Sequence, residues 1–307
     1  MIGDPGRPRL VFVAANASID RLYEVDHLAV GSIHRPTAVV PRPGGKGLNA
    51  ARAAAALGAR VTAVGIVGGR SGDWIVERLA EMGVEASMLR SAVETRTCIS
   101  ILDRSTGSLT ELYERGVEIE PAAWEALEVI VARELDRGDV GALTFSGSLP
   151  PGAPTDGYAR IARLAGARSV PVLAERPAVV KVNAAEAGDA AGLSVVDAGS
   201  AVVAARVLRD RGAIAVVVTL GTAGAVAVSA ADEARLEPPD VRGAYPVGSG
   251  DAFLAGLATA LVGGSPLIGA ARLGMAAGIA NALLPGAGEL DRTTAERLVG
   301  LVVVTPL

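Results

Sequence analysis

Short apolar strands alternate with helix-forming stretches along most of the 307-residue chain, and this alternation limits the fold more than any other feature. The pattern predicts strands at residues 9–14, 61–67, 140–145, 179–182, 213–220 and 225–228. It predicts helices at residues 47–57, 73–82, 124–135, 156–164, 250–262, 266–283 and 293–301. Strands that are apolar on both faces are typical of a parallel sheet covered by helices on both sides. We therefore expect an α/β fold with a mainly parallel central sheet.

Two stretches, residues 22–41 and 95–115, look like strands without intervening helices. Their apolar and polar residues alternate, as in Thr97-Cys98-Ile99-Ser100-Ile101, which is the pattern of a half-buried sheet. We interpret both as parts of one small β-rich lid, inserted twice into the sheet domain. The alternative is a pair of ordinary surface hairpins. No long linker interrupts the chain, so residues 1–307 are expected to form a single domain.

Composition excludes several kinds of partner. The net charge is -4 and no long basic run occurs, which argues against nucleic acid. No apolar run reaches the ~18–20 residues that a membrane-spanning helix needs. Cys98 is the single cysteine, so no intramolecular disulfide can form, and the first residues lack the pattern of a secretory signal. We expect a cytoplasmic protein that acts on small molecules.

The strongest local motif is Pro246-Val247-Gly248-Ser249-Gly250-Asp251, directly before an apolar helix. Glycines at a helix start allow a tight turn and expose consecutive N–H groups at the positive end of the helix dipole. Such a turn can hold an anion. Asp251 then has two interpretations of about equal weight: a helix cap, or a base that takes a proton from an attacking hydroxyl.

A second glycine cluster, Gly44-Gly45-Lys46-Gly47, also opens a helix. It lacks the spacing of a Walker A loop. Asn49 in the same helix can offer a donor and an acceptor to a sugar hydroxyl, and Lys46 can meet a phosphate. The alternative is an ordinary junction between a loop and a helix.

Two weaker motifs follow later strands. Asn183 and Glu186 lie on one side of a helical turn, where they could hold Mg²⁺ through water or simply cap the helix. Residues 219–224 join two predicted strands and could cradle nucleotide phosphates or form a tight turn.

Taken in order, these motifs resemble those of the ribokinase-like (PfkB-type) carbohydrate kinases. The set comprises residues 44–49, 146–152 (Ser-Gly-Ser-Leu-Pro-Pro-Gly), 181–186, 219–221 and 248–251. The resemblance runs from about Val11 to the end of the chain. Residues 44–52, 94–97 and 146–152 are most similar to the hexose-phosphate branch, which includes 1-phosphofructokinase and tagatose-6-phosphate kinase. The resemblance implies a three-layer α/β/α sandwich with a β-rich lid, which is often also the dimer contact.

The resemblance also implies a role for each motif residue. The catalytic group comprises the base Asp251 and an anion hole at Gly248, Ser249 and Gly250. The sugar would be bound by Asp20, Gly44, Gly45 and Asn49, and its phosphate by Lys46 and Arg96. The ATP phosphates would meet Lys181, Asn183 and Glu186, the last two holding Mg²⁺ through water. The nucleotide would lie against Thr219, Gly221, Thr222 and Gly224, with Asn281 near the adenine.

The implied reaction is transfer of phosphate from ATP to a ketohexose phosphate, giving a bisphosphate and ADP. The acceptor would be fructose-1-phosphate, fructose-6-phosphate or tagatose-6-phosphate. One alternative is a kinase of an unphosphorylated sugar or a nucleoside. A second is a catalytically weak regulatory protein that binds nucleotide or sugar phosphate.

Two departures from the family pattern stand out. Tyr245 and Pro246 replace an Asp/Asn-Thr pair, which removes an N–H and a hydroxyl and weakens the case for a K⁺ site near this loop without excluding one. Compared with the family pattern, the chain also lacks about ten residues before Lys181. The remaining link is too short for a parallel crossover, so the strand-like residues 170–173 are expected to be displaced or irregular.

Overall fold

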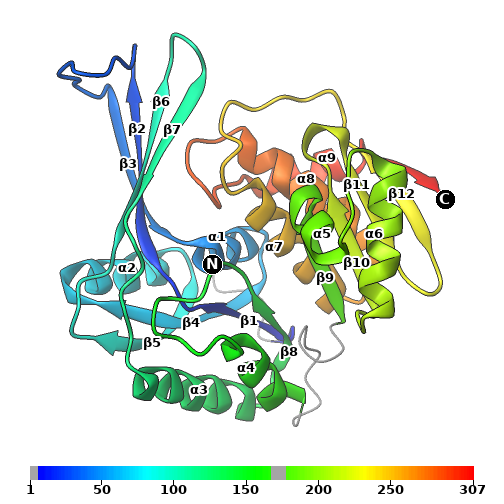
Figure 1. Ribbon diagram of the computed structural model, residues 1–307, viewed down its shortest axis with the longest axis horizontal. Coiled ribbons are helices and arrows are strands. Elements are labelled where there is room, and N and C mark those ends of the chain that lie inside the picture. Colours follow the sequence, from blue (N-terminus) through cyan, green and yellow to red (C-terminus); the bar gives the residue numbers. More distant parts are fainter. Residues whose placement is uncertain (1–5, 167–177) are drawn as a thin grey trace.

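The computed structural model describes residues 6–166 and 178–307, and it confirms the expected α/β architecture (Figure 1). A parallel sheet of order β5-β4-β1-β8 forms one half of the body. Its strands are β1 (Arg9–Ala14), β4 (Arg60–Gly68), β5 (Val84–Ser91) and β8 (Val140–Phe145). β1 is buried along its whole length, because both faces of this sheet are covered by helices.

The second half is a five-stranded sheet of order β13-β12-β11-β10-β9. Its strands are β9 (Val179–Asn183), β10 (Ala215–Thr219), β11 (Ala225–Val228), β12 (Glu233–Glu237) and β13 (Val303–Pro306). β9 and β10 are parallel, and the other neighbours are antiparallel. Within the described residues β8 and β9 are edge strands of their sheets, and residues 167–177 lie between them in the chain.

Helices form the two outer layers. One layer contains α3 (Pro121–Asp136), α4 (Gly157–Gly166), α5 (Ala184–Ala191) and α6 (Ala198–Asp210). The other contains α1 (Lys46–Ala56), α2 (Gly69–Glu81), α7 (Ser249–Val262), α8 (Leu267–Ala282) and α9 (Arg292–Val299). α7 packs against α1 and against α8, so it contacts both halves of the body. None of the described helices combines the length and apolar character required to cross a membrane.

Glycines bring α7 and α8 into main-chain contact. A Cβ on Gly256 of α7 would lie 2.9 Å from Cα of Gly274 in α8, and one on Gly278 would lie 2.9 Å from the Ser249 carbonyl oxygen. Any larger residue at these positions would force the helices apart. The start of α7 is therefore held by backbone contacts.

The two stretches without helices pair with one another in one four-stranded sheet, the lid sheet, of order β3-β2-β6-β7. It consists of β2 (Ser18–Val25), β3 (Ala38–Gly44), β6 (Thr97–Asp103) and β7 (Ser108–Tyr113). Parallel pairing of β2 with β6 joins two hairpins that are far apart in sequence. The sheet begins at Ser18, before the expected residue 22, and projects away from the body (Figure 1).

The structure corrects several element predictions. The helix expected at 73–82 begins at Gly69, because glycines at 69 and 72 obscured its first turn. The strand expected at 213–220 is shorter, running from Ala215 to Thr219. β5, α5, α6, β12 and β13 were not predicted as elements. Residues 170–173 fall outside the described residues.

Candidate active site

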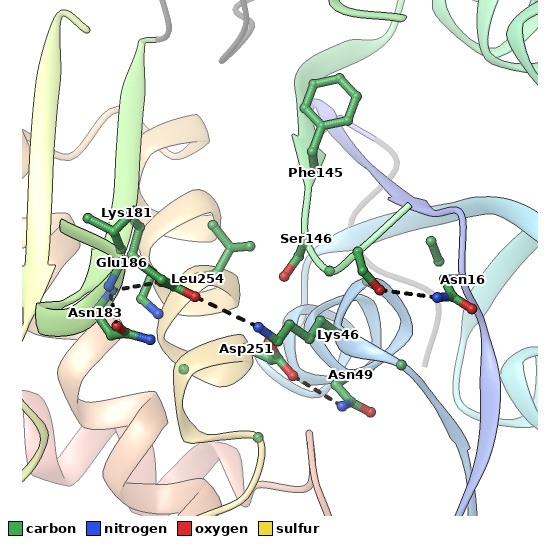
Figure 2. A pocket seen from close by; sticks show the side chains of 18 of the residues that line it. Asn16, Lys46, Asn49, Phe145, Ser146, Lys181, Asn183, Glu186, Asp251 and Leu254 are labelled. Atoms are coloured by element: carbon green, nitrogen blue, oxygen red, sulfur yellow. Dashed lines mark hydrogen bonds and ion pairs between the residues drawn. The ribbon is translucent and has the colours of Figure 1, made fainter. Parts of the chain in front are cut away.

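A cavity of about 1030 Å³ lies where the ends of β1, β8, β9 and β10 meet the starts of α1, α5 and α7. The lid sheet contributes Asp20, Cys98 and Tyr113 to its lining. Figure 2 shows Asp251, Asn49 and Lys46 grouped together, with Lys181, Asn183 and Glu186 on one side and Asn16 on the other. The sequence motifs from five separate regions therefore meet in one cleft.

The first turn of α7 has the geometry expected of an anion site. Gly248, the residue before the helix, has φ of +82°, and a Cβ there would lie 2.6 Å from Cα of Ala287. Only glycine fits this position. The helix start leaves the N–H groups of Gly250 and Asp251 without intrahelical partners, next to the cavity. These donors suit a phosphoryl group.

Asp251 is buried at the same helix start, with 9% of its surface exposed. Burial raises the pKa of its carboxyl group to about 6. A hydrogen bond from Asn49 and the positive charges of Lys181 and Lys46 oppose this effect and keep the pKa from rising further. Nδ2 of Asn49 donates to Oδ2 of Asp251 over 3.1 Å. The carboxylate is thus largely ionised at neutral pH and able to accept a proton.

The turn between β3 and α1 places Asp20 against two glycines. A Cβ on Gly44 would lie 2.0 Å from Cγ of Asp20, and Gly45 has φ of +87°. Ser18 donates to Oδ1 of Asp20 over 2.6 Å, which fixes the carboxylate at the cavity wall. The Asp20 carboxylate, which can accept hydrogen bonds from hydroxyl groups, therefore lines the same cavity as Asn49.

Three cations line the cavity. Lys46 is more than half exposed, and its Nζ lies 3.9 Å from Oε1 of Glu186. Arg96 donates to the carbonyl oxygens of Glu114 (3.0 Å) and Asn16 (3.1 Å). Burial lowers the pKa of Lys181, against the charges of Asp251 and Glu186. Nζ of Lys181 would lie 3.0 Å from a Cβ on Gly250, which places it beside the anion site.

Asn183 and Glu186 form a capping box at the start of α5. Oδ1 of Asn183 accepts from the Glu186 N–H, and Oε2 of Glu186 accepts from the Asn183 N–H, each over 2.9 Å. Oε1 of Glu186 is directed to Lys46 across the cleft (Figure 2). In the described part of the chain no group of three or more His, Cys, Asp or Glu side chains forms a direct metal site. The pair suits a metal held through water.

A second cavity of about 600 Å³ adjoins the first, and Thr219, Gly221 and Gly250 line both. Thr222 and Gly224 line only the second, together with Phe253, Met275 and Ile279 among others. The four residues expected at the nucleotide are therefore gathered around one partly apolar cavity. The two cavities meet at the start of α7.

Asn281 was expected near the adenine. Its side chain is fully buried and lines neither cavity among the described residues, but its neighbours Gly278, Ile279 and Ala282 on α8 line the second cavity. Nδ2 of Asn281 donates to the Val247 carbonyl oxygen (2.9 Å), and Oδ1 accepts from the Gly288 N–H (2.7 Å). The amide joins the glycine turn before α7 to the loop after α8.

The sequence analysis missed Asn16 and Ser148 as site residues. Nδ2 of Asn16 donates to Oγ of Ser148 over 3.1 Å at the cavity wall. Both residues follow the ends of parallel strands, β1 and β8, where ligands of α/β sheets bind. That position was the available signal.

Known proteins match this chain along most of its length. The model of the pfkB family of carbohydrate kinases matches residues 9–294. The 1-phosphofructokinase of Rhodobacter capsulatus is 33% identical over 280 residues, which cover 87% of this chain and 88% of that protein. The ATP-dependent 6-phosphofructokinase isozyme 2 of Mycobacterium tuberculosis is 30% identical over 97% of this chain and 91% of that protein. The structure of Escherichia coli phosphofructokinase-2 in complex with potassium superposes with a TM-score of 0.86 at 25% identity, covering 96% of this chain and 98% of that one. The chain belongs to the pfkB family of carbohydrate kinases.

Proposed function

We propose that this kinase transfers the γ-phosphoryl group of ATP to a hydroxyl of a ketohexose phosphate. The acceptor class comprises fructose-1-phosphate, fructose-6-phosphate and tagatose-6-phosphate, and the products are a bisphosphate and ADP. The observation that carries the proposal is the meeting of two cavities at the start of α7, beside Asp251. One cavity has cations for a phosphorylated acceptor, and the other has space for a nucleotide. The names of the relatives from R. capsulatus and M. tuberculosis support the same acceptor class.

In this mechanism Asp251 takes the proton from the acceptor hydroxyl while the oxygen of that hydroxyl forms a bond to the γ-phosphorus. The bond from that phosphorus to the β–γ bridging oxygen breaks, and ADP leaves. The N–H groups of Gly250 and Asp251, with Lys181 beside them, stabilise the charge on the transferring group. Asn183 and Glu186 would hold Mg²⁺ through water, and the ion would neutralise charge on the β- and γ-phosphates.

We assign the lid sheet two tasks, which its position supports. It carries Asp20 and Tyr113 into the lining of the cavity, so its approach to the body would exclude water during transfer. On its other face it exposes large apolar side chains, among them Val39 and Leu112. These support contact with a second copy of the chain, and a monomer in sedimentation equilibrium at micromolar concentration would contradict that contact.

A panel of acceptors with coupled detection of ADP tests the substrate class. Ketohexose phosphates are expected to give a kcat/KM well above those of free sugars and nucleosides. Preference for a free sugar or nucleoside would favour the alternative kinase. Binding of ATP without transfer to any acceptor would favour a regulatory protein.

Arg96→Ala is expected to raise KM for the phosphorylated acceptor by about 10- to 100-fold, because a charge-assisted hydrogen bond to the substrate's phosphate is lost. The KM for a free sugar should change little. Arg104→Ala is the matched control, since Arg104 also lies at the lid but pairs with Asp26 away from the cavity. An unchanged KM in Arg96→Ala would remove Arg96 from the phosphate site.

We also propose that turnover requires no monovalent cation. Pro246 offers no hydroxyl, and the Tyr245 hydroxyl donates to Glu24 over 3.1 Å. The Val247 carbonyl oxygen already accepts a hydrogen bond from Nδ2 of Asn281, which uses one of its two lone pairs. Replacing K⁺ with tetramethylammonium should change kcat less than twofold, whereas a drop of tenfold or more would contradict the proposal.

A further inference from the structure

The side-chain amide of Asn49 is held at both ends. Its Nδ2 donates to Oδ2 of Asp251, and its Oδ1 accepts from Nη2 of Arg52, each over 3.1 Å. A half-turn of the amide would place its oxygen against the Asp251 carboxylate and its NH₂ against the Arg52 guanidinium. Both contacts would then be repulsive, because two acceptors and two donors would face one another. The guanidinium therefore determines which end of Asn49 faces Asp251.

Arg52 itself is fixed by the loop that follows α8. Nη1 of Arg52 donates to Oε1 of Glu289 over 2.5 Å, and Nη2 also donates to the carbonyl oxygen of Ala287. Only 3% of Arg52 is exposed, and it lines neither of the two large cavities within the described residues. A Cβ on Gly288 would lie 2.6 Å from the Asn49 carbonyl oxygen, so this loop also packs directly on α1. A buried charge is costly unless it is paired, and here both terminal nitrogens of Arg52 have acceptors while its Nε has none. The partners are thus concentrated on the side of the guanidinium that contacts Asn49 and the loop after α8.

We propose that Arg52 is a positioning residue for the catalytic base: it holds the Asn49 amide in the one orientation that donates to Asp251, while Glu289 holds Arg52. The proposal rests on the proposed role of Asp251 in phosphoryl transfer. Arg52 touches neither substrate nor Asp251, and it acts through Asn49 alone. The Asn49 hydrogen bond stabilises the ionised carboxylate and also aims it into the cleft.

The effect of Arg52 on the titration of Asp251 can be separated from the effects of the charged groups around Asp251. The charged groups facing Asp251 are Lys181 on β9, Lys46 on α1 and Asp20 on β2. All three remain when Arg52 is changed. A shift in the titration of Asp251 would therefore report the loss of the Asn49 donor.

The test is the pH profile of kcat/KM for the preferred acceptor. The wild-type acid limb is expected near pH 6. Arg52→Met should move this limb upward by about one pH unit, because the lost hydrogen bond to a carboxylate is of that size. At pH 6 the ionised fraction would fall about fivefold. The KM for ATP should stay within about twofold, since Arg52 does not line the second cavity, which we propose for the nucleotide.

Two further variants make the result specific. In an Asn49→Ala background the limb should already be raised, and adding Arg52→Met should move it no further. Arg42→Met is the matched charge control: Nε of Arg42 donates to the same Oε1 of Glu289 over 2.9 Å, yet Arg42 makes no contact with Asn49. Its acid limb should remain at the wild-type position.

If Arg52→Met does not fold, Arg52→Lys keeps a positive charge beside Glu289 but loses the forked contact, and the same upward shift is expected. The proposal is overturned if the limb does not move while activity falls equally at every pH. It is also overturned if the shift persists in the Asn49→Ala background. Failure of the proposed function would look different, because the wild-type enzyme would then transfer no phosphate to any acceptor.

Discussion

Asp251→Asn is expected to lower kcat by about 10²- to 10⁴-fold, because the variant keeps the shape of the base but cannot accept the acceptor's proton. Binding of ATP should be nearly unchanged, since Asp251 does not line the second cavity, which we propose for the nucleotide. The same variant should be more stable than the wild type at pH 7. Burial raises the pKa of Asp251 from 3.8 to about 6, so the folded state is destabilised by the ionised carboxylate above that pH. Removing the charge should add ~3 kcal/mol to the free energy of unfolding.

The measurements are steady-state kinetics, ATP titration and thermal unfolding. Asp20→Asn is the matched control, because it makes the same chemical change on another carboxylate of the same cavity. It should raise KM for the acceptor and leave kcat within about tenfold of the wild type. Turnover by Asp251→Asn close to the wild-type rate would refute the mechanism.

Arg9→Met is expected to reduce the free energy of unfolding by about 3–5 kcal/mol, which is the usual cost of breaking a buried ion pair. Arg9 is 1% exposed and donates to Glu134, Asp139 and Thr62 at the start of β1. Burial raises the pKa of Glu134 and of Asp139, but hydrogen bonds and charge from Arg9 and other donors outweigh burial and hold both below their usual values. Without Arg9, two partly buried carboxylates lose their main partner.

Thermal unfolding at several pH values checks this result. Both carboxyl groups have lowered pKa values in the fold, so their stabilisation is present above the unfolded pKa and disappears as the pH falls through the folded one. The difference between the wild type and Arg9→Met should therefore narrow in acid. Adding Glu134→Gln to the variant should recover part of the lost stability, because it removes an uncompensated charge. A difference that is constant with pH would show that Arg9 acts through packing alone. The kcat of Arg9→Met should be normal, since Arg9 lies at the opposite end of β1 from the cleft.

The sequence predicted the fold where local pattern and tertiary context agree. β1, β8 and β11 match their predicted bounds because each is a short apolar run bounded by turn residues. β12 was missed because charged and apolar residues alternate along this short antiparallel strand, so the segment contains no apolar run. α6 begins at a capping box formed by Asp197 and Ser200, a signal that was present but was not used.

The site was predicted as a set of motifs, but its contacts were not. The Asn-x-x-Glu pair was given two interpretations, and the structure shows that capping and a place in the cleft coexist, because Glu186 has two carboxylate oxygens. The partners of Arg52 and Arg9 lie more than 120 residues away, at Glu289 and Glu134. No local spacing encodes such pairs. The hydrogen bonds of Asn281 could not be predicted either, because an asparagine in an apolar helix looks the same in the sequence whether it faces a ligand or a neighbouring loop.

Because glycine contacts join α7 to α8, the residues proposed for phosphoryl transfer lie on a different part of the structure from those proposed to select the acceptor. The proposed base, Asp251, and the proposed anion site lie on a pair of helices that contact one another main chain to main chain at Gly256, Gly274 and Gly278. The acceptor's expected partners, Lys46 and Arg96, come instead from α1 and from the edge of the lid sheet. Substitutions in those parts can therefore change which sugar is accepted while the reactive centre keeps its geometry. Such a division allows one scaffold to diversify in substrate during evolution, and directed libraries should vary the lid sheet and leave the three glycines fixed.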